Sequence, residues 1–148
     1  EMTGWPKNDA NNILYFEILN LNIMNNKALF TSTLTGTIVY FLLGWLFYGI
    51  LFKDLYPSNA GESMLFIFLG CLFYALVFSL IYSRWAGVST FKSGAVIGFI
   101  LGTLYAISMS FFMASSLGTL DTERFITEIF IGMVTTGLMG GVIAWTIG

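Results

Sequence analysis

Four long stretches of the chain are almost free of charge, and they constrain its fold more than any other feature. They cover residues 28–52, 64–83, 94–117 and 125–147, and Glu128 is the only ionisable residue within them. A helix rises about 1.5 Å per residue and the hydrocarbon core of a bilayer is about 30 Å thick, so about 20 apolar residues cross it. Each stretch is therefore predicted to form a transmembrane α-helix.

The composition of the chain supports a membrane setting. Of its 148 residues, 57% are hydrophobic and 9% are charged, whereas soluble domains carry about 25% charged residues. A soluble domain of this length could not bury so much apolar surface, because small domains keep much of their surface in water. Strands of a membrane β-barrel are about ten residues long and alternate in polarity. The continuous runs therefore favour an all-α integral membrane protein.

The chain lacks residues that several functional classes require. It has no histidine and a single cysteine, Cys71, which excludes an internal disulfide, a zinc site of cysteine and histidine, and nucleophile pairs built on histidine. The net charge of −2 provides no basic surface for nucleic acid. We therefore expect no catalytic residue, no cofactor, no metal and no nucleic-acid partner, and we expect the lipid bilayer to surround the protein.

Residues 1–23 do not follow the pattern of the remaining chain. They are rich in asparagine, they carry Lys7, Asp9 and Glu17, and Met24 comes directly after them. One interpretation places the natural start at Met24, which would make this segment an upstream extension outside the fold. The alternative is a helix that lies at the membrane interface. Both interpretations leave residues 24–148 as one four-helix transmembrane domain.

The polar segments between the stretches predict the direction of each helix. These segments, residues 53–63, 84–93 and 118–124, are short enough to make consecutive helices antiparallel. Lys27, Arg84 and Lys92 lie on one side, against Lys53 and Arg124 on the other. Because lysine and arginine favour the cytoplasmic side, we expect a multi-pass protein of the cell inner membrane with both termini in the cytoplasm. Aromatic residues near the ends of the stretches fit the membrane–water interface: Trp45, Tyr48, Tyr82, Trp85 and Trp145.

Small residues recur at every fourth position in the later stretches. Gly94, Gly98 and Gly102 form such a row in the third stretch, and Gly132 and Gly140 belong to one in the fourth. Rows of this kind let helix backbones approach closely, which is how helices associate in lipid. We expect these five glycines to pack helices within the monomer, and the alternative is an interface between copies of the chain.

Glu128 and three tyrosines are the candidate functional residues. An acid inside a membrane span often binds a proton or a cation. However, residues 129–148 are long enough to span a bilayer alone, which would leave Glu128 at the interface, where the helix dipole favours a carboxylate. Tyr40, Tyr74 and Tyr105 fall near the centres of the first three stretches. Hydroxyls at that depth are expected to bond between helices or to line a small pocket.

A short aromatic motif ends the first stretch. It reads Gly44-x-x-Phe47-Tyr48-Gly49-x-x-Phe52. It resembles the signature of a bacterial family of small membrane proteins that is catalogued as domain of unknown function seventeen-sixty-one. In that signature a tryptophan stands at the place of Phe47 and a proline at the place of Ile50, and Tyr56 takes a later aromatic place. The resemblance implies four transmembrane helices over residues 24–148, with no known activity and no known catalytic residues.

Three functional hypotheses follow from these features. The first is a non-enzymatic membrane component that works through helix packing, either as a homo-oligomer or as an accessory subunit of another membrane protein. The second is a small transporter or channel in which Glu128 and the midplane tyrosines line a path. An intramembrane enzyme is a third hypothesis, which the missing catalytic groups disfavour.

Overall fold

The structure is a computed structural model that describes residues 7–57, 61 and 63–148. In chain order, its elements are α1 (Lys7–Leu46), the π-helical turn η1 (Phe47–Leu51), α2 (Met64–Leu80), the π-helical turn η2 (Ile81–Ala86), α3 (Phe91–Leu117) and α4 (Thr122–Ile147). Within the described residues there is no strand, and four helices are long and apolar enough to cross a membrane. The predicted all-α fold with four transmembrane helices is confirmed.

The membrane-spanning segments begin and end within three residues of the predicted stretches. They cover Asn26–Leu51, Met64–Arg84, Phe91–Leu117 and Thr122–Ile147. The third and fourth segments begin three residues earlier than predicted, because a polar side chain caps each helix. The Thr90 hydroxyl accepts from the Ser93 N–H at 3.4 Å, and the Asp121 carboxylate accepts from the N–H groups of Glu123 and Arg124 at 3.1 and 3.3 Å.

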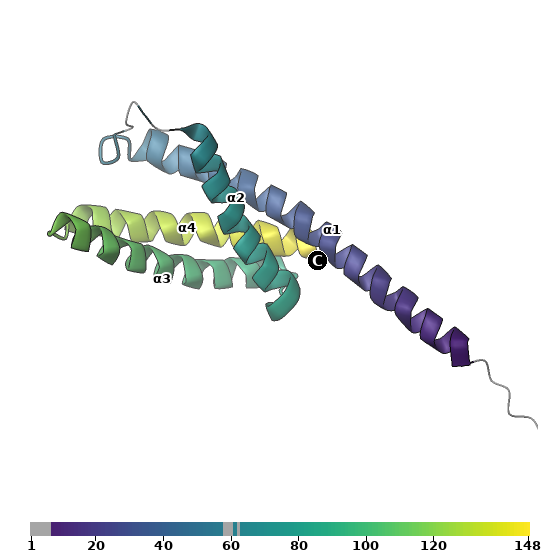
Figure 1. Ribbon diagram of the computed structural model, residues 1–148. Coiled ribbons are helices and arrows are strands. Elements are labelled where there is room, and N and C mark those ends of the chain that lie inside the picture. The colour runs from purple at the N-terminus through teal and green to yellow at the C-terminus, as the bar shows by residue number, and fades with distance from the viewer. Residues whose placement is uncertain (1–6, 58–60, 62) are drawn as a thin grey trace, which may run out of the picture.

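Helix α1 continues well beyond the first predicted stretch. It is one uninterrupted helix from Lys7 to Leu46, with no break at Met24 (Figure 1). The expected non-conforming segment is therefore helical from Lys7 onward, and residues 1–6 lie outside the described residues. That residues 1–23 are an upstream extension, or alternatively an interfacial helix, stays a prediction.

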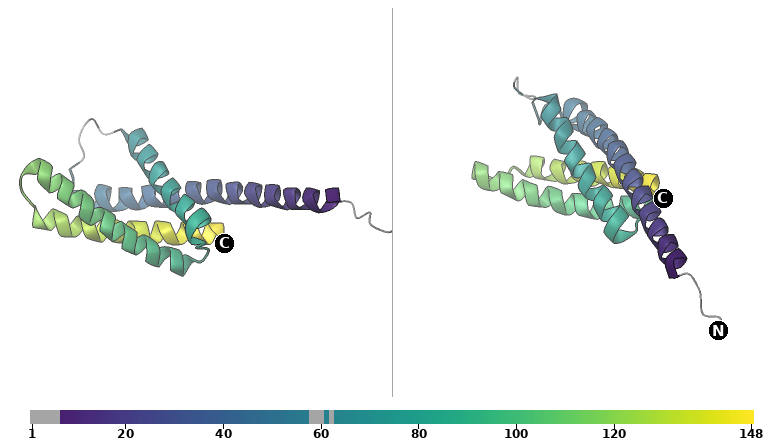
Figure 2. Two further views of the ribbon diagram at one scale, coloured as in Figure 1. Left: turned by 60° about the horizontal axis from the view of Figure 1, so that its bottom comes forward. Right: turned by 45° about the vertical axis from the view of Figure 1, so that its right-hand side comes forward.

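Consecutive helices run antiparallel, and α4 is the central element of the bundle. Helices α3 and α4 lie side by side along most of their length, while α1 packs against α4 and α2 (Figures 1 and 2). Helix α2 crosses the others obliquely (Figure 1). The core is formed mainly by α2 and α4, and it contains Ala75, Phe78, Tyr82, Val88, Met139, Ile143 and Ala144.

The outer surface of the bundle is apolar, as lipid contact requires. Phe30, Phe66, Phe73 and Phe112 are at least 64% exposed, and they come from three different helices. An apolar exposed face of this kind on a soluble monomer would be unusually large. The exposed apolar side chains and the length of the helices define a multi-pass membrane protein.

The two π-helical turns end the first two helices. At the end of η1 the Phe52 N–H donates to the Phe47 carbonyl five residues earlier at 2.8 Å, and at the end of η2 the Gly87 N–H donates to the Tyr82 carbonyl five residues earlier. A π-helical turn holds an additional residue, so it changes the direction in which nearby side chains point. Such turns are rare and often occur at functional sites.

Tyr82 faces the interior of the protein, although its position near a span end had suggested a side chain in contact with the membrane interface. It is fully buried, and its hydroxyl donates to the Gly94 carbonyl at 2.8 Å. The phenol therefore joins η2 to the start of α3. Trp45 and Trp145 are exposed, as interfacial aromatic residues are expected to be, and the Trp85 side chain lies outside the described part of the structure.

Candidate functional site

The glycine rows lie where α3 meets α4. A Cβ atom at Gly102 would lie 2.6 Å from the Gly132 carbonyl oxygen, and one at Gly140 would lie 2.7 Å from the Gly94 carbonyl oxygen. A Cβ at Gly94 or Gly98 would overlap the α4 backbone. The structure therefore brings all five of these glycines together at one contact within the monomer, where only hydrogen side chains fit between the two backbones.

The three midplane tyrosines also come together. The ring centroid of Tyr74 lies 5.0 Å from that of Tyr40 and 5.3 Å from that of Tyr105, so the three rings form one row across α1, α2 and α3. The row continues along α2, because the ring centroids of Tyr74 and Phe78 are 5.2 Å apart. These contacts are between rings, and within the described residues the tyrosine row has no hydrogen bond to Glu128.

Glu128 forms a separate site with residues at the end of α1. Tyr48, in η1, donates its hydroxyl to Glu128 Oε2 at 3.0 Å. The neighbouring Phe47 packs edge-to-face on Phe130 of α4, with ring centroids 6.3 Å apart. The π-helical turn thus places two of its own successive side chains against α4, and one of them reaches the carboxylate.

Tyr56 and Arg124 complete the polar part of this site. The Tyr56 ring meets the Tyr48 ring edge-to-face, with centroids 5.0 Å apart. The Arg124 guanidinium lies 5.9 Å from the centre of the Tyr56 ring, in a cation–π contact, and its Nε is 3.5 Å from Asp121 Oδ2. Both members of this ion pair are about half exposed, so the pair adds little stability.

A partly open cavity of about 360 Å³ lies beside Glu128, between α3, α4 and the segment after η1. This volume is within the range of small-molecule sites. Its apolar lining is Met109, Met113, Ala114, Leu117, Leu120 and Phe125. Its polar lining is Tyr56, Ser110, Thr119, Asp121, Arg124 and Glu128.

Two polar atoms in the walls of the cavity are enclosed and unsatisfied. The hydroxyls of Tyr56 and Ser110 have no hydrogen-bond partner within the part of the chain that the structure describes. Burial of the Tyr56 phenol raises its pKa above the ordinary value of 10.0, and the nearby Glu128 carboxylate raises this pKa further. Enclosed hydroxyls are normally paired, so these two leave polar groups unsatisfied in the wall of the cavity.

Glu128 lies inside the span but away from its middle. It is the seventh of the 26 residues of α4, so it is about 10 Å along the axis from the centre of that helix. The hydrocarbon core extends about 15 Å from its midplane. A centred α4 would therefore place Glu128 within the outer third of the core, while Asp121 and Arg124 would reach the headgroup region.

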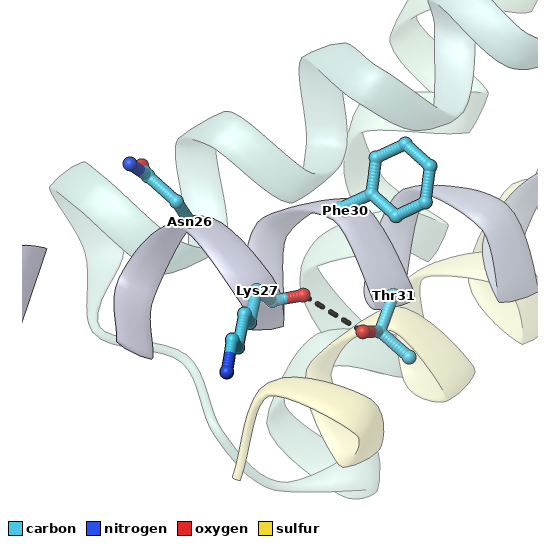
Figure 3. Close-up of a pocket in the computed structure, with 4 residues that line it drawn as sticks. All are labelled: Asn26, Lys27, Phe30 and Thr31. Atoms are coloured by element: carbon cyan, nitrogen blue, oxygen red, sulfur yellow. Dashed lines mark hydrogen bonds between the residues drawn. The ribbon is translucent and has the colours of Figure 1, made fainter. Parts of the chain in front are cut away.

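A more open hollow lies on the outer face of α1. Its volume is about 460 Å³, and its lining residues are Asn26, Lys27, Phe30 and Thr31 (Figure 3). These residues come from successive turns of one helix, and Thr31 donates its hydroxyl to the Lys27 carbonyl at 2.7 Å (Figure 3). Because no second element brings groups toward this hollow, we assign no function to it.

Sequence reasoning identified Glu128 but not the residues around it. The sequence pattern indicated the membrane interface for Tyr48 and a polar loop for Asp121 and Arg124, and it gave no functional signal for Ser110. The aromatic motif at residues 44–52, with its later Tyr56, was the one signal that contained two of the site residues.

Within the described residues, no group of three or more histidine, cysteine, aspartate or glutamate side chains could hold a metal ion.

The fold and the cavity together define the class of protein as a small multi-pass helical membrane protein with a partly open site near one end of its bundle. Comparison of the chain with family models, curated proteins and solved structures finds no match.

Proposed function

We propose that this protein is a small membrane transporter or channel that binds a cation or a proton at Glu128, and that it catalyses no covalent reaction. The supporting observation is the setting of that carboxylate, which is half-buried in a membrane-spanning helix, accepts from Tyr48 and lines a partly open cavity. Ionisable groups in such positions commonly mark ion and proton pathways. The cavity lining holds the carboxylates of Asp121 and Glu128 against the single guanidinium of Arg124, which favours a positive ion.

The proposal is tested by flux through proteoliposomes that contain the purified chain. Proton and sodium fluxes are followed with a pH-sensitive dye and with radioactive sodium, under an imposed membrane potential. We expect flux with the wild type and its loss with Glu128→Gln. Glu123→Gln is the matched control, because Glu123 is an exposed glutamate on the first turn of the same helix. Equal flux in wild type and Glu128→Gln, or no flux in either, would contradict the proposal.

An accessory or oligomeric component is the second candidate, and two open glycines support it. Gly44 and Gly70 lie in the membrane-spanning parts of α1 and α2, and a side chain at either position would meet no described atom within 4 Å. Glycine weakens a helix interior by about 0.5–1 kcal/mol relative to alanine. A helix of a second copy or of another membrane protein could approach closely there. Gly44→Leu and Gly70→Leu should then reduce the oligomer size measured by native mass spectrometry, and an unchanged size would argue against this candidate.

We further propose that the protein lies in the bacterial inner membrane with both termini in the cytoplasm. The excess of Lys27, Arg84 and Lys92 over Lys53 and Arg124 supports this orientation. Membership of the family known as domain of unknown function seventeen-sixty-one is also a proposal, and it rests on the aromatic motif. The orientation is tested with the variants Ser89→Cys and Gly61→Cys, which are treated in intact cells with a thiol reagent that cannot cross the inner membrane. Labelling of position 61 alone is expected, because segment 53–63 would lie outside and segment 84–93 would lie in the cytoplasm.

A further inference from the structure

We propose that the cavity beside Glu128 binds a protonated amine that carries an apolar body. This inference rests on the proposed function and specifies the ligand class of the same site. The ammonium group would lie against Glu128 and the Tyr56 ring, and the apolar body would lie against the methionine and leucine side chains of the wall.

The charge in the cavity favours a cation. Asp121 already has two roles, because its carboxylate caps α4 and contacts Arg124. Glu128 forms no salt bridge within the described residues, and the groups beside its carboxylate are the neutral phenols of Tyr48, which donates to it, and Tyr56. A carboxylate without a counter-ion in an apolar wall is costly, and a ligand cation would lower that cost.

The hydrogen-bonding groups favour an amine over a metal ion or an ion without N–H groups. The Glu128 carboxylate can accept several ammonium N–H groups at once. The Tyr56 ring, which belongs to the cavity wall, adds cation–π attraction. Arg124 already lies over the Tyr56 ring, so the site attracts a cation even within the chain itself.

The position of the cavity favours a molecule that is polar at one end and apolar along its body. Six of the lining residues are apolar, and they extend along α3 and the first turns of α4. The lining also includes Asp121 and Arg124, which a centred α4 places in the headgroup region. A molecule that concentrates at the membrane surface can therefore enter with its amine directed toward Glu128.

The test compares three probes that share one apolar body and differ in charge. These are 4-phenylbutylamine, which is protonated at neutral pH, the neutral 4-phenylbutanol and the anion 4-phenylbutyrate. Binding to the full chain in lipid nanodiscs is measured by calorimetry, with empty nanodiscs subtracted, and sodium chloride alone is the fourth arm. We expect saturable binding of the amine only. The proposal would be overturned if the alcohol bound as tightly as the amine or if the anion bound. It would also be overturned if sodium alone gave a binding heat that the amine did not reduce.

Variants on α4 are expected to change amine binding in opposite directions. Glu128→Gln should weaken amine binding at least about tenfold through loss of the ion pair, while Glu123→Gln should leave it unchanged. Arg124→Gln should tighten binding, because it removes a like charge and frees the face of Tyr56. Weaker amine binding in Arg124→Gln would contradict the placement of the ammonium group beside Glu128 and Tyr56.

A cavity-filling variant covers the case in which Glu128→Gln does not fold. Ala114→Trp keeps every charge and fills the apolar part of the cavity, so it should abolish amine binding while the helical circular dichroism is preserved. Retained binding in this variant would overturn the proposal.

The ligand proposal and the transport proposal can be refuted separately. If proton or sodium flux depends on Glu128 but the amine does not bind, only the ligand class is wrong. If the amine binds but no flux occurs, only the transport function is wrong.

Discussion

Replacing Gly102 with alanine should force α3 and α4 apart. The new Cβ would lie 2.5 Å from Thr136 Cβ and 2.6 Å from the Gly132 carbonyl oxygen, whereas ordinary van der Waals contact begins at 3.4 Å. The differences between these values are 0.9 and 0.8 Å. The Gly132 oxygen is part of the helix backbone and cannot rotate away, so the helices themselves must separate by nearly this amount.

The expected loss of stability follows from that separation. A gap of about 0.5–1 Å forfeits a quarter to a half of the dispersion energy of each atom pair that it separates, and overpacking of a tight contact costs about 1–3 kcal/mol. Alanine recovers about 0.5–1 kcal/mol through its higher helix propensity. Gly102→Ala should therefore lower the free energy of unfolding by roughly 0.5–2 kcal/mol.

Gly70→Ala provides the matched control for this prediction. Gly70 also lies in a membrane-spanning helix, but a Cβ there would meet no described atom within 4 Å. This variant should be neutral or slightly stabilising, by up to about 1 kcal/mol. Both variants are unfolded with increasing dodecyl sulfate in mixed micelles and followed by far-UV circular dichroism. If Gly102→Ala is as stable as Gly70→Ala, the reasoning from close backbone contact is wrong.

Three further predictions concern single side chains. Asp121→Ala removes the N-cap of α4 and should lower stability by about 0.5–2 kcal/mol; an unchanged melting temperature would contradict this. Tyr82→Phe removes a buried hydrogen bond and should cost about 0.5–1.5 kcal/mol, more than Tyr105→Phe at a half-exposed position. The raised pKa of the Tyr56 phenol stabilises the fold below pH 10.0, and this contribution is lost as the pH rises toward the folded-state pKa. Unfolding titrations across this range should therefore show a smaller loss of stability for Tyr56→Phe than for the wild type, and equal losses would refute the assignment.

The fold was predictable from the sequence because each transmembrane helix is a local feature. Run length and the absence of charge predict a span without any knowledge of its neighbours, since every helix satisfies its own backbone hydrogen bonds in lipid. The glycine spacing likewise indicated which faces allow close approach. The helix starts were less exact, because the caps at Thr90 and Asp121 extend the helices into segments whose charges suggested loops.

The site was only partly predictable, because it depends on how distant helices are rotated against one another. Tyr48 and Glu128 are 80 positions apart in the chain. The periodic pattern of either segment does not predict that the two side chains meet. The π-helical turn that directs Tyr48 toward α4 has no sequence signature in the ordinary 3.6-residue pattern. Tyr82 shows the same limit. Its position near a span end indicated contact with lipid headgroups, but its hydroxyl donates to the Gly94 carbonyl at the start of α3.

The length of α1 has a mechanical consequence. The membrane-spanning part begins at Asn26, so residues 7–25 of the same straight helix project about 28 Å beyond it. A rigid rod of this kind acts as a lever. A change in tilt of about 10° within the bilayer would displace its far end by about 5 Å. Small rearrangements around the bundle would thus be amplified at a distance from the membrane, where another molecule could sense them.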